Sequence, residues 1–303
     1  MRSCPLVGFA YFFSVILFSV ASTVKAEITP SDVYERSEQV VLEIQHLRNE
    51  LNVQHSPRVP GVQNNKKPLH VYAKSLEILE KIHDAEVSMG LAAVKVEPIP
   101  LKVITPEDVF QQAELILEEL RKIQNSKNVG QSEEVAQLVL GKTPSDVYQN
   151  FWKASFMLDG LAPKISPDDV YQRSVLILKN LELLANKHSI SLETEVNTNP
   201  DETTPYQVNL QAYLNLHKFT YLEKKYGLNA FRVPEYPQGE INPSDVYDAI
   251  NMMMAELAYV KRHHKILIKV ESGSQSTGKK PKDVLSNLQL VGRNIDLLIS
   301  GIK

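Results

Sequence analysis

The sequence has almost no cysteine. Cys4 is the only one among 303 residues, and it lies in the segment that we predict to be removed as a signal peptide. A mature chain without cysteine forms no disulfide and offers no thiol nucleophile and no cysteine ligand for zinc or haem. This argues against a small extracellular module held together by disulfides.

The sequence also lacks an excess of basic residues. The chain carries 33 Lys and Arg against 36 Asp and Glu, a formal net charge of −3, and it has no basic run. The segment 1–26 contains Arg2 and Lys25 and no acid, so its removal takes away two positive charges and leaves −5. Because nucleic-acid binding leaves a basic footprint in a sequence, we expect no nucleic-acid partner.

The usual motifs of catalysis and metal binding are missing. The sequence holds no HExxH, no CxxCH, no Glu-x-x-His pair at equivalent positions of two repeats, no nucleophile elbow and no phosphate-binding loop. It therefore indicates no catalytic residue, no metal site and no cofactor. We interpret the chain as a non-enzyme.

The main apolar run lies at the start of the chain. Arg2 precedes an apolar stretch from Leu6 to Ala21, and "VKA" ending at Ala26 suits a signal-peptidase site. The sequence thus predicts a signal peptide over residues 1–26, and a periplasmic or secreted protein whose mature chain does not span a membrane. An uncleaved anchor is the alternative, but the run is short against the ~20 residues that a spanning helix needs.

A repeated phrase dominates the rest of the chain. "ITPSDVYERS" begins at Ile28 and "ISPDDVYQRS" at Ile165, and shorter versions bring the total to eight, each with a valine at the third position after a proline. The prolines are Pro30, Pro68, Pro106, Pro144, Pro167, Pro205, Pro243 and Pro281. Their numbers increase by 38 at every step, except for one step of 23 after the fourth. Such a fixed period is typical of a repeat architecture.

The phrase has the chemistry of a helix start. Thr29 can cap the first turn with its hydroxyl, Pro30 suits the first helical position, and Asp32 can accept from the cap N–H. Six of the eight copies have Asp at this position. Since each helix then contributes one carboxylate rather than several that converge, we interpret it as a cap and not as a calcium ligand.

Apolar residues follow each proline in steps of three and four, which predicts one amphipathic helix of about 18–22 residues per repeat. The predicted fold class is all-α, with eight helical repeats of 38-residue period in two four-helix units. The connections are long and several are rich in proline, so we expect them to be extended. Such connections allow either parallel or alternating helices, and residues 132–141 could add a short helix.

The short step divides the repeats into two sets of four that match in order, with an offset of 137 in the numbering. After the second helix of each set, "GLAAVKVEPIPLKVITP" (90–106) aligns without a gap with "GLNAFRVPEYPQGEINP" (227–243). We infer that a four-repeat unit was duplicated whole. The predicted units are 27–163 and 164–303, joined by an antiparallel turn at 162–166.

The matched connection is also the candidate binding site. Loops usually diverge faster than cores, so a loop retained across the duplication either packs tightly along its bundle or forms a binding edge. For the second case we predict Lys95, Arg232 and Tyr236 as contact residues.

The sequence favours an exported, non-enzymatic helical-repeat protein that binds another envelope or extracellular protein, or acts as a scaffold. The alternative is a small-ligand-binding or sensory bundle with one pocket in each four-helix unit. Filled cores with an exposed apolar patch would favour the first hypothesis. A pocket with convergent polar groups inside each unit would favour the second.

Overall fold

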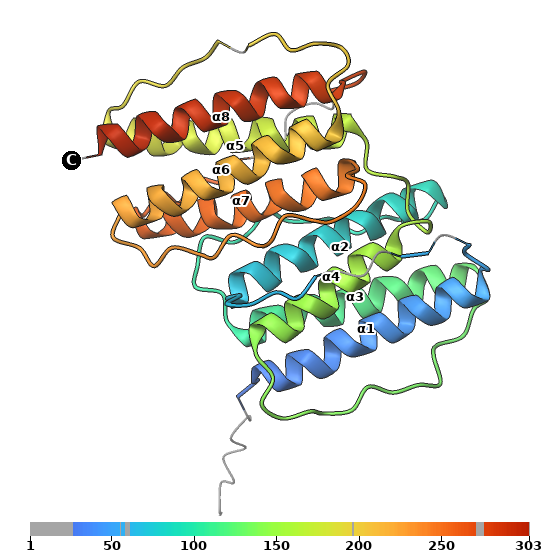
Figure 1. The fold of residues 1–303 in the computed structure, drawn as a ribbon. Coiled ribbons are helices and arrows are strands. Elements are labelled where there is room, and N and C mark those ends of the chain that lie inside the picture. The colour runs from blue at the N-terminus through green and yellow to red at the C-terminus, as the bar shows by residue number, and fades with distance from the viewer. Residues whose placement is uncertain (1–26, 55, 58–60, 196, 271–275, 303) are drawn as a thin grey trace, which may run out of the picture.

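The computed structural model describes residues 27–302, except for 55, 58–60, 196 and 271–275. Eight α-helices lie within this part of the chain, which confirms the predicted all-helical repeat fold (Figure 1). They are α1 (Pro30–Glu50), α2 (Pro68–Ser88), α3 (Pro106–Ser126), α4 (Pro144–Leu158), α5 (Pro167–His188), α6 (Pro205–Lys225), α7 (Pro243–His263) and α8 (Pro281–Gly301). The predicted signal peptide falls outside the described residues.

Every helix begins at a repeat proline, and the predicted cap forms. At α1 the backbone N–H of Thr29 donates to Asp32 Oδ2 at 2.7 Å, and the same bond joins Ser166 to Asp169 at α5 at 2.8 Å. Hydrogen bonds from Thr29 hold the pKa of Asp32 below its usual value. The repeated aspartate therefore acts on its own helix end, because it binds donors that the first turn leaves free.

All four helices of a unit point the same way. Pro30, Pro68, Pro106 and Pro144 line one small pocket, together with the valine that follows each of them at the third position. The four prolines that begin α5–α8 do the same in the second unit. Since the helix starts of a unit converge at one end, each long connection has to return along the bundle before the next helix begins.

Each unit has its own apolar core. In the first unit α1 and α2 each pack against α3 and α4, and in the second α5 and α6 each pack against α7 and α8. The first core includes Phe151 and the second Phe219, both fully buried, and neither cluster takes a residue from the other unit. The apolar stripe of each helix thus faces its own bundle axis.

The matched connections pack tightly along their bundles. Glu86 near the end of α2 accepts a hydrogen bond from the backbone N–H of Val94 at 2.7 Å. Its equivalent Glu223 on α6 accepts from Phe231 at 3.0 Å. Val94 and Phe231 are buried in the two cores. This packing is one physical reason for the retained loop sequence.

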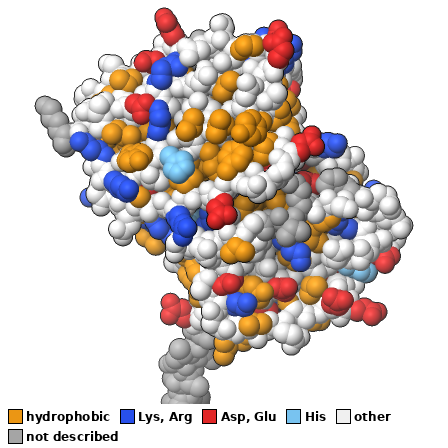
Figure 2. All heavy atoms as spheres, in the orientation of Figure 1, with side chains coloured by type: hydrophobic (Ala, Val, Ile, Leu, Met, Phe, Trp, Pro, Cys, Tyr) orange, Lys and Arg blue, Asp and Glu red, His pale blue; other side chains and the backbone are white. Residues whose placement is uncertain are grey.

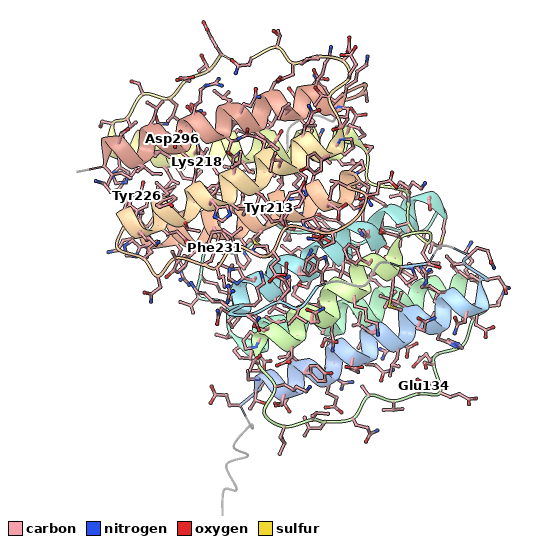
Figure 3. All side chains as sticks on the ribbon, viewed as in Figure 1. Glu134, Tyr213, Lys218, Tyr226, Phe231 and Asp296 are labelled. Atoms are coloured by element: carbon pink, nitrogen blue, oxygen red, sulfur yellow. The ribbon has the colours of Figure 1, made fainter. Side chains whose placement is uncertain are left out.

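The prediction of a short helix at 132–141 is wrong, because this segment is extended along α1. The Gln39 amide nitrogen donates to the carbonyl of Glu134 at 3.3 Å, and its oxygen accepts from the N–H of Ala136 at 2.9 Å (Figure 3). A side chain of α1 therefore satisfies backbone groups that a helix would have satisfied internally.

The two units pack antiparallel through α2 and α7, the one helix pair that joins them among the described residues. His70 at the start of α2 contacts Glu256 late in α7, whereas Glu80 further along α2 accepts from the Tyr247 hydroxyl early in α7. This arrangement fits the antiparallel turn predicted between α4 and α5. Within the described ranges, every helix is too short or too polar to cross a bilayer.

Candidate interaction surface

α6 carries apolar side chains on its outer face as well as on its core face. Val208, Phe219 and their neighbours fill the second core, but four large apolar residues point outward. Tyr206, Leu210, Leu214 and Tyr221 keep 55, 43, 50 and 60 % of their surface exposed. Figure 2 shows apolar side chains gathered over the second unit, where Figure 1 places α6. We call Tyr206, Leu210, Leu214, His217 and Tyr221 the α6 face.

The connection from α6 to α7 extends this surface with an aromatic edge. The Tyr236 ring lies 4.9 Å from the ring of Tyr213 and 5.9 Å from that of Tyr206. The Tyr213 hydroxyl also donates to the carbonyl of Glu235 at 3.3 Å, which anchors the connection to α6 (Figure 3). Burial raises the pKa of Tyr213 and of Tyr236, so both remain neutral donors at physiological pH.

The three residues predicted from the matched connection lie in different settings. Tyr236 borders the α6 face. Arg232 is exposed on the same connection. Lys95 lies on the equivalent connection of the first unit, where its ammonium contacts Glu97 at 2.6 Å. A binding role for Lys95 and Arg232 stays a prediction.

The helix equivalent to α6 in the first unit is α2, and its outer face is buried against α7. With the offset of 137, Leu214 corresponds to Glu77 and His217 to Glu80. Glu77 accepts from Asn251 of α7 at 3.1 Å, and Glu80 accepts from Tyr247 at 2.7 Å. The α6 face therefore occupies the position at which the other unit makes its helix–helix contact.

The α2–α7 contact is rich in buried charge. Lys74 bridges two carboxylates, Glu77 at 2.8 Å and Asp248 at 2.9 Å, and the Trp152 indole N–H donates to Asp248 at 2.9 Å. Burial alone would raise the pKa of Glu77, but the Lys74 ammonium lowers it to about 2. Burial and the Glu77 charge raise the pKa of Asp248 to about 7. This cluster joins the units by partnered charges.

A second buried pair lies nearer the start of α2. His70 contacts Glu256 of α7, and burial lowers the pKa of His70 to about 3, so its imidazole is neutral. Glu256 lies beside Glu223, and burial together with this neighbouring carboxyl raises the pKa of Glu223 to about 9. Burial raises the pKa of Glu256 as well. The Glu223 carboxyl is therefore protonated at neutral pH.

A cavity of about 140 Å³ lies at the junction of the units, between α2, α5, α7 and their connections. Most of the polar residues that line it pair with one another. Arg173 pairs with Glu80, and the Lys261 ammonium donates to Asn180 at 2.6 Å. Such mutual pairing is what a structural junction needs, whereas a ligand site keeps polar groups free to converge on a ligand.

Histidines meet at the far end of the second unit. His188 and His264 occupy the same position of their repeats, at the helix ends, and their rings are 5.1 Å apart. Tyr226, at the equivalent position of the repeat between them, packs 4.0 Å from His264. Burial and the nearby histidines lower the pKa of His264 to about 4. Nowhere in the described part of the chain do three or more His, Cys, Asp or Glu side chains form a group that could hold a metal ion.

Sequence reasoning missed the α6 face, although a signal for it was present. In "YQVNLQAYLNLHKFTYLEKK" (206–225), apolar residues surround the helix instead of forming one stripe. An otherwise amphipathic repeat whose outer face is also apolar indicates a second contact surface. In comparisons with known proteins, no family model, no curated protein and no solved structure matched the chain.

Proposed function

We propose that the protein is a non-enzymatic interaction module that docks the apolar side of a partner's helix on the α6 face. The observation that carries the proposal is the row of half-exposed Leu210, Leu214 and Tyr221 on a regular helix. Exposed apolar residues scattered singly need no explanation, but a contiguous row favours protein contact. A helix laid against such a row is a common mode of recognition.

Two features favour this proposal over a small-ligand-binding bundle. The apolar cores of the two units are formed by their own side chains, including Phe151 and Phe219, and a hollow of about 550 Å³ beside Tyr226 and His264 lies at the open end of the second unit rather than within its core. The polar groups around the junction cavity pair with one another, as Arg173 does with Glu80. The ligand-binding alternative would instead have each unit enclose a pocket with convergent polar groups.

The partner we propose is a protein of the cell envelope or of the extracellular space. This part of the proposal rests on the signal peptide predicted at residues 1–26 and on the absence of cysteine after it. Complete burial of an apolar side chain of this size stabilises a complex by about 1.5–3 kcal/mol. Because the three side chains are already half covered, we expect roughly 1 kcal/mol from each.

Photo-cross-linking in the native host tests the proposal. A photoreactive phenylalanine analogue replaces Leu214, and the matched control places it at Leu138, which is equally exposed at 50 % but lies on the extended segment along α1. We expect a discrete cross-linked species from position 214 that position 138 does not give, identified by mass spectrometry. Equal labelling at the two positions, or none at 214, would show that the α6 face is not a docking surface.

A further inference from the structure

We propose that the partner on the α6 face is the α6 face of a second copy, packed antiparallel about a two-fold axis. This inference rests on the proposed function, since it requires that the α6 face docks a helix. It goes further by naming the occupant. Three observations support it: the spacing of the exposed residues, the charges at the two ends of α6, and the chemistry of the other candidate face.

The exposed residues of α6 have the spacing of a coiled-coil seam. Six of its eight exposed residues follow one another in alternating steps of three and four positions, at Gln207, Leu210, Leu214, His217, Tyr221 and Lys224, whereas Tyr206 and Lys225 lie beside this line. This 3.5-residue repeat keeps one line of side chains facing a partner helix. Along α6 itself, the seam spans about 26 Å at the usual helical rise.

The seam is complementary to itself when it is reversed. If Leu214 of one copy lies level with His217 of the second copy, Leu210 lies level with its Tyr221. Gln207 then lies level with its Lys224. Each layer pairs a larger side chain with a smaller or flexible one, and the apolar residues meet at the centre. A two-fold axis makes every such contact twice, as an isologous interface requires.

Charges at the ends of α6 favour the antiparallel direction. Glu202 is exposed just before the helix, and Lys224 and Lys225 are exposed at its end. Antiparallel copies bring the acidic end of one helix to the basic end of the other, and they align the two helix dipoles favourably. Parallel copies would bring the lysines of both chains together.

A head-to-tail chain of copies is disfavoured. In the internal contact α2 packs on α7, and the first-unit equivalent of α7 is α3. A head-to-tail assembly would therefore place α6 on α3 of the next copy. The residues that α3 exposes are polar, namely Gln111, Glu118, Arg121, Asn125 and Ser126. Covering Leu210 and Leu214 with these groups would desolvate charge without a matching partner.

Analytical ultracentrifugation of the mature chain tests the dimer. One helix pair buries less than a standard interface, so we expect a dissociation constant on the order of 1–100 µM. Leu214→Lys should weaken association at least about tenfold, because symmetry places the new charge in the seam twice. The matched control Leu138→Lys should leave the dimer unchanged. A mature protein that is monomeric at high micromolar concentration, or a dimer insensitive to Leu214→Lys, overturns the proposal.

Thiol cross-linking tests the direction, and the mature chain has no cysteine of its own to interfere. Leu210→Cys and Tyr221→Cys, carrying different tags, are mixed and treated with a short bis-maleimide. Antiparallel copies give the mixed product, whereas either variant alone gives little, because its two thiols are offset by about 16 Å along the helices. Cross-linking of each variant to itself would instead indicate parallel copies.

The two proposals can fail separately. A monomeric protein whose position 214 still cross-links to a different protein overturns the dimer and leaves the docking surface in place. A monomeric protein without cross-links at position 214 overturns both.

Discussion

The buried carboxyl pair of the second unit predicts an unusual dependence of stability on pH. In the first unit Glu86 pairs with Lys122 at 2.7 Å, and Lys122 also contacts Glu119. The equivalents in the second unit are Glu223, Tyr259 and Glu256, so no cation stands at the Lys122 position, and the Lys67 ammonium lies over the Tyr259 ring instead, at 4.5 Å. Burial and the neighbouring Glu256 then raise the pKa of Glu223 to about 9.

The sign of the effect follows from this raised pKa. A carboxyl whose pKa is higher in the folded state holds a proton that the unfolded chain releases, so stability falls as pH rises between the two pKa values. Here the window runs from about 4.5 to about 9. The slope for one proton is at most about 1.4 kcal/mol per pH unit, which would total about 5 kcal/mol by pH 8.

Glu223→Gln removes the titration and keeps an oxygen that accepts from the N–H of Phe231. Because the proton is shared with Glu256 and the side chains can relax, we expect the variant to gain about 1–3 kcal/mol of unfolding free energy over the wild type at pH 8, and little at pH 5. Urea denaturation at one-unit steps from pH 5 to 9 measures the difference. The exposed Glu182→Gln is the control, and we expect no pH-dependent difference from it.

Tyr259→Lys offers an independent check, since it restores the ammonium that the first unit has between its two glutamates. It should also reduce the fall in the free energy of unfolding between pH 5 and pH 9. A difference between Glu223→Gln and wild type that stays constant from pH 5 to 9 would show that the carboxyl does not titrate within this window, and the reasoning would be refuted.

Three further predictions concern the fold. His70→Ala leaves the Glu256 carboxyl at the α2–α7 contact without its histidine partner, so we expect the free energy of unfolding to fall by about 2–3 kcal/mol. In calorimetry, we expect the single unfolding transition to separate into two. Phe219→Ala removes a fully buried ring from the second core and should cost about 3–5 kcal/mol in urea denaturation. Asp169→Ala removes the acceptor of the Ser166 N–H but leaves the Ser166 hydroxyl as the cap of α5, so it should lower the free energy of unfolding by about 1 kcal/mol at most, whereas Asp169→Asn, which keeps an acceptor oxygen, should lower it less.

The sequence could predict the helices because each helix start is encoded locally. A cap, a proline and an aspartate in close succession determine where a helix begins, whatever the rest of the chain does. The direction of the helices could not be predicted in this way. It depends on how far an extended connection returns, and that in turn depends on long-range anchors such as Glu86 and Glu223. Segment 132–141 was misjudged for the same reason, since its backbone partners lie on α1.

The candidate site was predicted only at its edge. Tyr236 was found because its connection matches an equivalent connection across the duplication. Leu210, Leu214 and Tyr221 were missed because the periodicity was used to find the stripe that faces the core. Two apolar stripes on one helix cannot be assigned to inside and outside from spacing alone, since each has the helical period.

The duplication makes the α6 face informative, because it supplies a comparison within the chain. Two equivalent helices have equivalent outer faces, and among the helices that the structure describes only α2 has one from the other unit packed on it. The covered face carries charged residues such as Lys74 and Glu77, whereas the uncovered α6 face carries Leu210 and Leu214. If solvent exposure alone decided which residues stand where, the charged residues would lie on the uncovered face and the apolar residues on the covered one.

Inside the chain, buried charges are tolerable because partners such as Asp248 are fixed in place. The core of an interface between separate chains is depleted of charged residues and enriched in aromatic ones. The residues of the α6 face are therefore those expected of a contact that forms and dissociates in solution.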